Sequence, residues 1–216
     1  GEAWGWGPYL NGRMRAEEEP AAHEAATRAL RLAQAPGAVS GVERALIHAM
    51  QVRYAATEEE AQEGRAERDE AYADAMAEVY AAYPGDLDVG TLYGEALMLL
   101  EPRRGTWPLD KPSVQHIHRT LEEVLARDLS HPGACHLYVH ATESTPNAHL
   151  AEPCADILGN SIPGASRINH MPSHTYNRVG RWSDAVRANQ QAWHSDQRAE
   201  IGEGFAIYPS HNLHML

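Results

Sequence analysis

The chain has 216 residues, and 30 acidic against 18 basic side chains give it a formal net charge of −12 at pH 7. The length suits one domain with a sizeable core, and the hydrophobic content of 43% excludes a globally disordered chain. A strongly acidic protein repels nucleic acid and anionic membrane surfaces, and no apolar run approaches the roughly 20 residues of a membrane-spanning helix. The unusual feature is the presence of 13 His beside a single Phe.

Helical periodicity recurs along the chain, Ala and Glu are abundant and β-branched residues are sparse, so we expect an all-α fold. Pro-Gly and Pro-Asn pairs separate several of the expected helices, and a longer loop carries Trp107. The expected helices cover residues 21–34, 41–54, 67–82, 87–101, 113–128, 133–144, 147–158, 165–179 and 182–196, with a further helix opening at 209.

The two ends of the sequence suggest a piece of a longer protein. The chain starts at Gly1 without a signal-peptide pattern, and residues 209–216 have the pattern of a helix that has just begun. We therefore expect a single helical-repeat domain over 1–216 within a longer chain.

A repeat motif refines the fold class. Gly180, Trp182, Ala185 and Ala192 have the spacing of a tetratricopeptide-repeat turn, in which Gly ends one helix and the two Ala let the next helix pack closely. This resemblance implies an α-solenoid of antiparallel helix pairs, wound as a right-handed superhelix, with the first helix of each pair on the concave face.

Two histidine pairs follow the same period. His136 and His140 are four residues apart on one expected helix, and His170 and His174 repeat that spacing, so each pair shares one helix face. The second pair follows the first by 34 residues, which is the length of one tetratricopeptide repeat. We expect the two pairs to lie side by side on neighbouring helices.

The pattern continues toward the C-terminus, because Pro172-Ser173-His174 recurs as Pro209-Ser210-His211. An earlier parallel is Leu92-Tyr93-Gly94-Glu95-Ala96, which matches the sequence around His140. The three expected rows are Glu95, His140, His174 and His211; His136 and His170; and Glu143, Asn177 and His214.

Such rows predict a metal centre. Packed helices lie about 8–10 Å apart, so imidazoles from two of them can meet at one ion. Nitrogen-rich ligation suits transition metals, and we expect one or two ions, with copper or iron favoured and zinc as a further candidate. The expected ligands are His136, His140, His170, His174, His211 and His214. Glu143 and Glu95 are the expected ligands or catalytic proton-transfer groups, and Tyr138, Tyr176 and Asn177 are the expected hydrogen-bonding neighbours of the ligands.

Cys135 and Cys154 lie at the same level of an expected helical hairpin, so a disulfide between them is geometrically plausible. It would indicate an oxidising compartment, the bacterial periplasm or the extracellular space. Two buried free thiols are the alternative, and ligation of a metal by Cys135 is a third interpretation.

The chain as a whole resembles a family of bacterial tetratricopeptide-repeat proteins of poorly assigned function. The resemblance implies a repeat fold and a bacterial source, but no particular reaction. Cys135 departs from the pattern, since a polar residue such as Asn is expected there. The matching stretches are Gly7-Pro8-Tyr9-Leu10-Asn11, Leu92 to Ala96, His136 to Glu143, His170 to His174 with Arg178 to Arg181, and His211-Asn212-Leu213-His214.

Three functions are consistent with these patterns. The first is a metal-binding repeat protein with a mono- or dinuclear centre on its concave face, acting as a metal-dependent oxidoreductase on a small-molecule substrate. The second is a scaffold that binds a peptide or partner protein in its groove. The third is metal sequestration without turnover. No nucleophile elbow, zinc-protease motif or phosphate loop is present, and the sequence does not indicate the oligomeric state.

Overall fold

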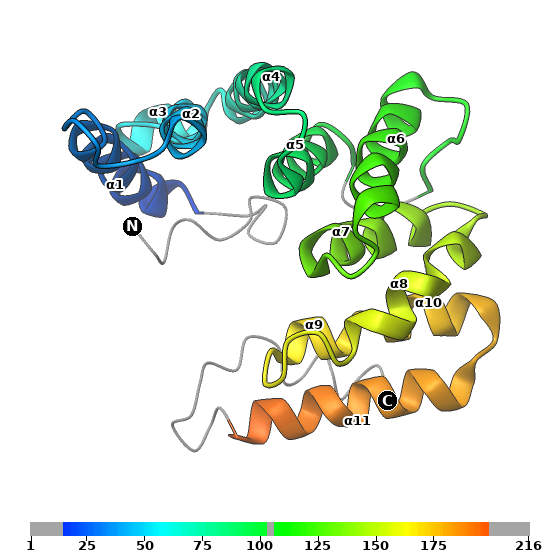
Figure 1. Ribbon diagram of the computed structural model, residues 1–216. Helices are drawn as coiled ribbons and strands as arrows, with labels where there is room; N and C mark the ends of the chain where they lie inside the picture. Colours follow the sequence, from blue (N-terminus) through cyan, green and yellow to red (C-terminus); the bar gives the residue numbers. More distant parts are fainter. Residues whose placement is uncertain (1–14, 103–105, 199–216) are drawn as a thin grey trace. The chain divides into compact units, whose positions relative to one another are not determined.

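The computed structural model describes residues 15–102 and 106–198, and over these ranges it contains helices and no strand. The predicted all-α class is therefore confirmed (Figure 1). Contacts divide the chain into two compact units, residues 1–103 and 104–216, which are described separately. The single repeat domain over 1–216 stays a prediction. Within the described ranges, no helix has the length and apolarity required to cross a membrane.

The first unit is a series of helices that pack on their neighbours. Helix α1 packs on α2, α2 on α4, and α4 on α5. The starts of α2, α3 and α5 are fixed by the side chains of Ser40, Thr57 and Asp86, each of which accepts a backbone N–H of the first turn. The elements are the 3-10 helix η1 (Ala16–Glu18), α1 (Glu19–Leu32), α2 (Gly41–Gln51), α3 (Glu58–Gln62), α4 (Arg65–Ala82) and α5 (Leu87–Leu99).

A buried network of ion pairs holds this unit together. Glu19 and Arg53 are each only 1% exposed. The carboxylate of Glu19 lies 2.5 Å from Nη1 of Arg65 and 3.2 Å from Nη2 of Arg68. Asp69 pairs with both Arg53 and Arg65. The network thus ties α1 to α4 and to the turn after α2, and removing one member would leave buried charge uncompensated.

We expect Glu19→Gln to lower the free energy of unfolding by about 3 kcal/mol, because it leaves the buried guanidinium groups without one of their carboxylates. Urea denaturation measures the loss. Glu24→Gln is the matched control on the same helix, since Glu24 is exposed, and should leave stability unchanged. Equal stability of the two variants would show that the network does not hold the unit together.

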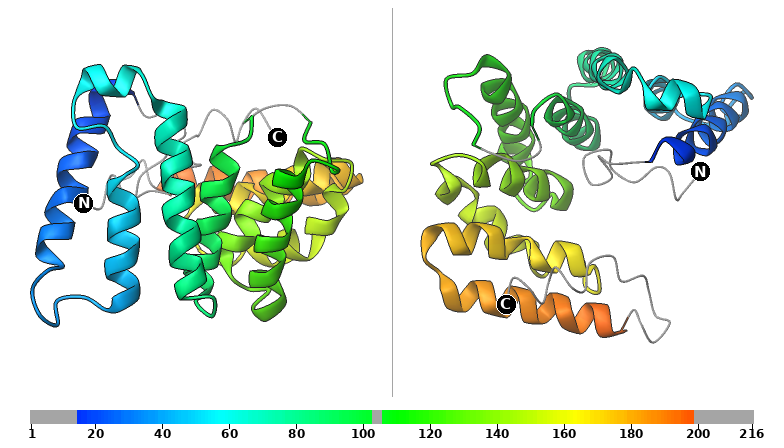
Figure 2. Two further views of the ribbon diagram at one scale, coloured as in Figure 1. Left: turned by 90° about the horizontal axis from the view of Figure 1, so that it is seen from above. Right: turned by 180° about the vertical axis from the view of Figure 1, so that it is seen from behind.

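The second unit carries the histidines. Helix α6 packs on α7, α7 on α8, and α10 contacts α7, α8 and α11, while α9 packs on α11 (Figure 2). Its elements are α6 (Pro112–Arg127), α7 (Pro132–Glu143), the 3-10 helix η2 (Ala148–Ala151), α8 (Glu152–Leu158), α9 (Ser166–His170), α10 (Pro172–Val179) and α11 (Trp182–Arg198).

The helix predicted over 165–179 is divided in two. Pro172 has no N–H to donate to the preceding turn, so α9 ends at His170 and α10 starts at Pro172. Gly180 then ends α10 in the left-handed region, with φ 81°, which glycine adopts without strain. Ala185 and Ala192 of α11 are 2% and 0% exposed, so their small side chains lie against neighbouring helices.

Two links, one at each end of α7, secure this unit. Cys135 of α7 and Cys154 of α8 form a disulfide, with their Cα atoms 5.0 Å apart. In the loop before α6, the backbone N–H of Trp107 donates to the carbonyl of Ser144 at 2.8 Å, and the Trp107 side chain is buried. Both links hold the helix from which two of the histidines project.

Candidate functional site

Four imidazoles and one carboxylate of the second unit come together from three helices. His136, His140 and Glu143 lie on α7, His170 on α9 and His174 on α10. We call these five residues the histidine cluster. The ring centroids of His136 and His140 are 5.0 Å apart, those of His140 and His174 are 5.8 Å apart, and those of His170 and His174 are 4.6 Å apart. The predicted pairs therefore do lie side by side.

Helix α7 positions three members of the cluster. Pro132 occupies its first turn, and Nδ1 of His131 accepts the N–H of Ala134, so the helix begins at a defined point. Residues four apart then project from one face, which places His136 next to His140. Both rings are nearly buried, at 4% and 8% exposure.

Glu143 joins two of the helices through hydrogen bonds to two imidazoles. Its Oε1 lies 2.5 Å from Nδ1 of His140, and its Oε2 lies 2.5 Å from Nδ1 of His174. A carboxylate can only accept, so both Nδ1 atoms carry hydrogen and donate. This arrangement orients both rings so that their Nε2 atoms are directed away from the carboxylate.

His170 is oriented in the same way by an amide. Its Nδ1 lies 2.7 Å from Oδ1 of Asn189, with Ser173 Oγ farther away at 3.4 Å. The Nδ2 of Asn189 donates to the carbonyl of Ala185, which assigns the acceptor oxygen to the side facing His170. Nε2 of His170 then lies 2.8 Å from Nε2 of His174.

The series of hydrogen bonds from Glu143 to Asn189 requires hydrogen at defined nitrogen atoms. Glu143, His174, His170 and Asn189 are joined in series by three hydrogen bonds, and the two outer bonds each need hydrogen on an Nδ1. The two Nε2 atoms face each other at 2.8 Å, and a single hydrogen between them would complete the series.

The remaining groups of the cluster have shifted pKa values. Burial lowers the pKa of His136 well below its ordinary value, and the electrostatic effects of the nearby His140 and Arg167 lower it further. Burial also lowers the pKa of His140, against the opposing effect of the hydrogen bond that His140 donates to Glu143. Burial alone would raise the pKa of Glu143, but the hydrogen bonds from His140 and His174 outweigh it and hold that pKa well below its usual range. His136 and His140 are therefore neutral near pH 7, and Glu143 is ionised.

One nitrogen of the cluster is buried without a hydrogen-bond partner. It is Nε2 of His136, whose ring packs against His140. A buried polar atom without a partner is costly, so it marks a place where a ligand would be stabilising.

The position of three other predicted site residues relative to the cluster stays a prediction. His211 and His214 fall outside the described residues. Glu95 belongs to the first unit, where it is 3% exposed and its charge raises the pKa of Tyr72 after the larger effect of burial. Its assignment to the same row as His140 stays a prediction.

The two tyrosines predicted to support the ligands bond to other side chains. The hydroxyl of Tyr138 donates to Glu122 at 2.7 Å, and that of Tyr176 donates to Asp156 at 2.9 Å. Tyr138 projects toward α6 because it lies between His136 and His140 in the sequence, on another side of α7. Both hydroxyls therefore donate to carboxylates outside the histidine cluster, and the role of these tyrosines as neighbours of metal ligands stays a prediction.

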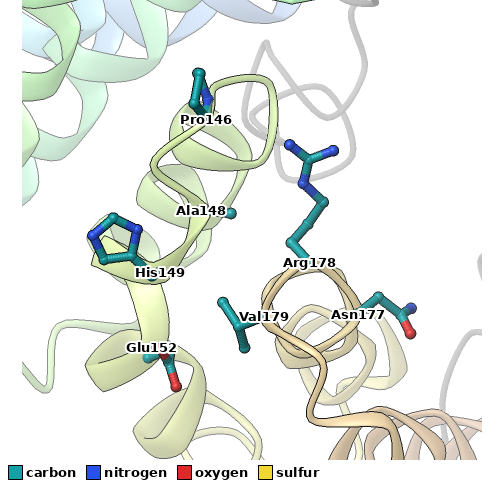
Figure 3. A pocket seen from close by; sticks show the side chains of 7 residues that line it. All are labelled: Pro146, Ala148, His149, Glu152, Asn177, Arg178 and Val179. Atoms are coloured by element: carbon teal, nitrogen blue, oxygen red, sulfur yellow. The ribbon is translucent and has the colours of Figure 1, made fainter.

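The predicted neighbour Asn177 lines a surface pocket. Figure 3 shows this pocket between the segment that leads into α8 and the C-terminal turn of α10. None of the five residues of the histidine cluster lines it. Its lining residues are Pro146, Ala148, His149, Glu152, Asn177, Arg178 and Val179.

The sequence interpretation missed Arg167 and Asn189. Nη2 of Arg167 lies 3.4 Å from Nε2 of His140. Arg167 precedes His170 by three residues and so shares its helix face, which is a signal that spacing could have supplied. Asn189 is 19 residues away from His170 on another helix, and only the packing of α9 on α11 brings the two together.

Within 15–102 and 106–198, no group of three or more His, Cys, Asp or Glu side chains already has an arrangement that could hold a metal ion. His140, His170 and His174 are instead hydrogen-bonded to Glu143, to Asn189 or to one another. Comparison of the chain with known protein families, curated proteins and solved structures finds no match.

The lowered pKa values of His136 and His140 predict loss of stability in acid. The unfolded chain takes up protons near the ordinary value of 6.5, whereas these folded rings resist protonation until a lower pH. Their contribution is therefore fully present above about pH 6.5 and is lost as the pH falls toward the folded pKa. We expect His136→Gln to reduce the slope of unfolding free energy against pH by up to about 1.4 kcal/mol per pH unit between about pH 6 and pH 5.

Urea denaturation at several pH values measures these slopes. His194→Gln is the control, because His194 is exposed on α11 of the same unit, and its slope should match that of the unchanged protein. If His136→Gln kept the full slope, a buried neutral His136 would be refuted.

Proposed function

We propose that the histidine cluster binds a transition-metal ion and that the chain is a metal-binding protein. The observation that carries the proposal is the orientation of the rings. Nδ1 of His140, His170 and His174 each donates to an oxygen of Glu143 or Asn189. These rings therefore direct their Nε2 atoms away from Glu143 and Asn189. A hydrogen-bonded Nδ1 with Nε2 available to an ion is the usual state of a metal-binding histidine.

The distances within the cluster fit such a site after a small movement. Two nitrogen ligands at about 2.0–2.1 Å from a tetrahedral ion are about 3.3 Å apart, and their ring centroids are about 5 Å apart. The neighbouring centroids here are 4.6–5.8 Å apart, and the two facing Nε2 atoms are 2.8 Å apart. Separation of His170 from His174 by about 0.5 Å would therefore accommodate an ion.

The hydrogen bonds within the cluster are compatible with metal binding because a proton and a metal ion compete for the same nitrogen atoms. Without an ion, we infer one proton between Nε2 of His170 and Nε2 of His174, which face each other at 2.8 Å. A metal ion would replace that proton, and the negative charge of Glu143 would then offset part of the ion's charge. This competition explains why the described side chains form no ready-made ligand group.

The donors are nitrogen-rich and lack thiolate, since both cysteines form the disulfide. Such a set favours copper, iron or zinc. A bound copper or iron ion would supply one-electron chemistry, which supports assignment as an oxidoreductase, while this chain's residues orient the ligands and hold protons. His211 and His214, and Glu95, remain candidates for a second ion or for proton transfer.

The proposal extends to the fold and the location of the protein. A tetratricopeptide-like solenoid of antiparallel helix pairs is supported by the left-handed Gly180 and by the buried Ala185 and Ala192 at the predicted spacing. A periplasmic or secreted location in a bacterium is supported by the disulfide between Cys135 and Cys154, because such bonds persist in oxidising compartments.

The test of the metal site is the double variant His140→Ala, His174→Ala. We expect the unchanged protein, purified without a metal-affinity tag, to bind about one equivalent of copper, iron or zinc, and the variant to lose it. Elemental analysis and calorimetric titration measure the metal. The double variant His149→Ala, His194→Ala is the matched control, since both rings are exposed in the same unit.

Equal metal content in the two double variants would assign the metal to another place. Protein that neither contains nor takes up metal would contradict the proposal and favour a groove that binds a peptide.

The proton inferred between His170 and His174 generates a separate prediction. Binding of a metal ion at the cluster should release at least about one proton near pH 7, because the proton between His170 and His174 must leave. Calorimetric titration in buffers of different ionisation enthalpy measures that number. The single variant His170→Ala, which lacks the shared proton, should release fewer protons, and equal release would contradict the count.

A further inference from the structure

Another pocket of the second unit lies along helix α6 and has a volume of about 270 Å³. Five of its lining residues are at positions 114, 115, 118, 119 and 122, which is the spacing of side chains that share one side of a helix. Nε2 of Gln115 donates to the carbonyl of Leu109 at 3.0 Å and so holds the preceding loop against the helix. No member of the histidine cluster lines this pocket. Its lining residues are Leu109, Val114, Gln115, His118, Arg119 and Glu122.

His118 provides this pocket with a hydrogen-bond acceptor. The residue is only 8% exposed, and its Nε2 lies 3.2 Å from the carbonyl oxygen of Ala141 on α7. A carbonyl can only accept, so Nε2 carries the hydrogen, and Nδ1 of the neutral ring can only accept in turn. Among the residues that the structure describes, none donates to this Nδ1. A largely buried acceptor without a donor from the protein favours a ligand that donates.

Two side chains of opposite charge also line the pocket, and both are exposed to solvent. Oε1 of Glu122 accepts the hydroxyl hydrogen of Tyr138 at 2.7 Å, which orients the carboxylate and leaves its Oε2 available. Arg119 forms no ion pair with a carboxylate of the described residues. An ammonium group alone would be attracted by Glu122 but repelled by Arg119, and a carboxylate alone would meet the reverse. Only a ligand that carries both charges is attracted by both side chains.

We propose that this pocket binds a small zwitterion with an apolar substituent, which is the chemistry of an apolar α-amino acid. The ammonium group of the ligand donates to Oε2 of Glu122 and to Nδ1 of His118, and its carboxylate accepts from the guanidinium of Arg119. The apolar substituent lies against Leu109 and Val114. The volume of the pocket is below the range typical of sites for drug-sized ligands, so it suits a molecule as small as an amino acid. Binding at this pocket does not require the proposed metal ion.

The test is calorimetric titration of the full chain with valine, leucine and phenylalanine in turn, in the presence of a metal chelator. We expect saturable binding of at least one of them. Glu122→Gln and Arg119→Gln should each raise the dissociation constant about 10- to 100-fold, because each removes one charged partner of the ligand. Glu123→Gln is the matched control, since Glu123 is exposed on the same helix and does not line the pocket. This control changes the net charge as Glu122→Gln does, and it should bind the amino acid as before.

Two further probes test the need for both charges. 3-Methylbutylamine and 4-methylpentanoate keep the apolar part of leucine but only one of its charges, so each should bind at least about 10-fold more weakly than leucine. Equal binding of either probe would overturn the zwitterion site. The proposal is also overturned if none of the three amino acids shows saturation up to about 10 mM, or if Glu122→Gln and Arg119→Gln bind as tightly as the unchanged protein.

Discussion

The carboxylate of Glu143 is the constraint around which the candidate site is arranged. It is partly buried, and a buried negative charge is tolerated only when donors surround it. Nδ1 of His140 and Nδ1 of His174 supply those donors from two different helices. Once both Nδ1 atoms are committed, the positions of both Nε2 atoms follow from the rigid rings. The packing of α7 against α10 therefore sets the chemistry that the cluster can perform.

In this cluster, a proton and a metal ion would compete for the same imidazole nitrogen atoms. The Nε2 atoms of His170 and His174 face each other, and Asn189 fixes the outer end of the series. These two imidazoles are hydrogen-bonded without a ligand, so they can be buried in the folded chain. An incoming ion of sufficient affinity can then take the place of a proton between them.

The two units use buried charge in different ways. In the first unit, Arg53, Arg65 and Arg68 pair with the carboxylates of Glu19 and Asp69. A guanidinium cannot give up its proton, so that network is fixed and serves stability. In the second unit the buried groups are mainly imidazoles, which, unlike a guanidinium, can exist in a neutral or a protonated form. Only the second kind of cluster can change its charge when a ligand arrives, and this difference favours the second unit as the functional one.

Much of this arrangement was already determined by the sequence. Helical periodicity predicted that His136 and His140 share one face, because that feature depends only on the regular geometry of a helix. The 34-residue spacing predicted that the second pair lies beside the first, and the rings of His140 and His174 are indeed neighbours. The turn at Gly180 was predicted for the same local reason. The tertiary structure alone decided the partners of these rings. Asn189 meets His170 through packing between helices, and no local pattern encodes that contact.

The hydrogen-bond partners of the two tyrosines could not be predicted from the sequence. Tyr138 and Tyr176 lie near the histidines along the chain, but their hydroxyls turn to Glu122 and Asp156 because each residue projects from a different side of its helix. The sequence also did not predict the buried ion network of the first unit. This network joins Glu19 to residues 46 or more positions away. Residue spacing within a helix determines which side chains share a face, whereas the direction in which each face packs depends on the whole domain.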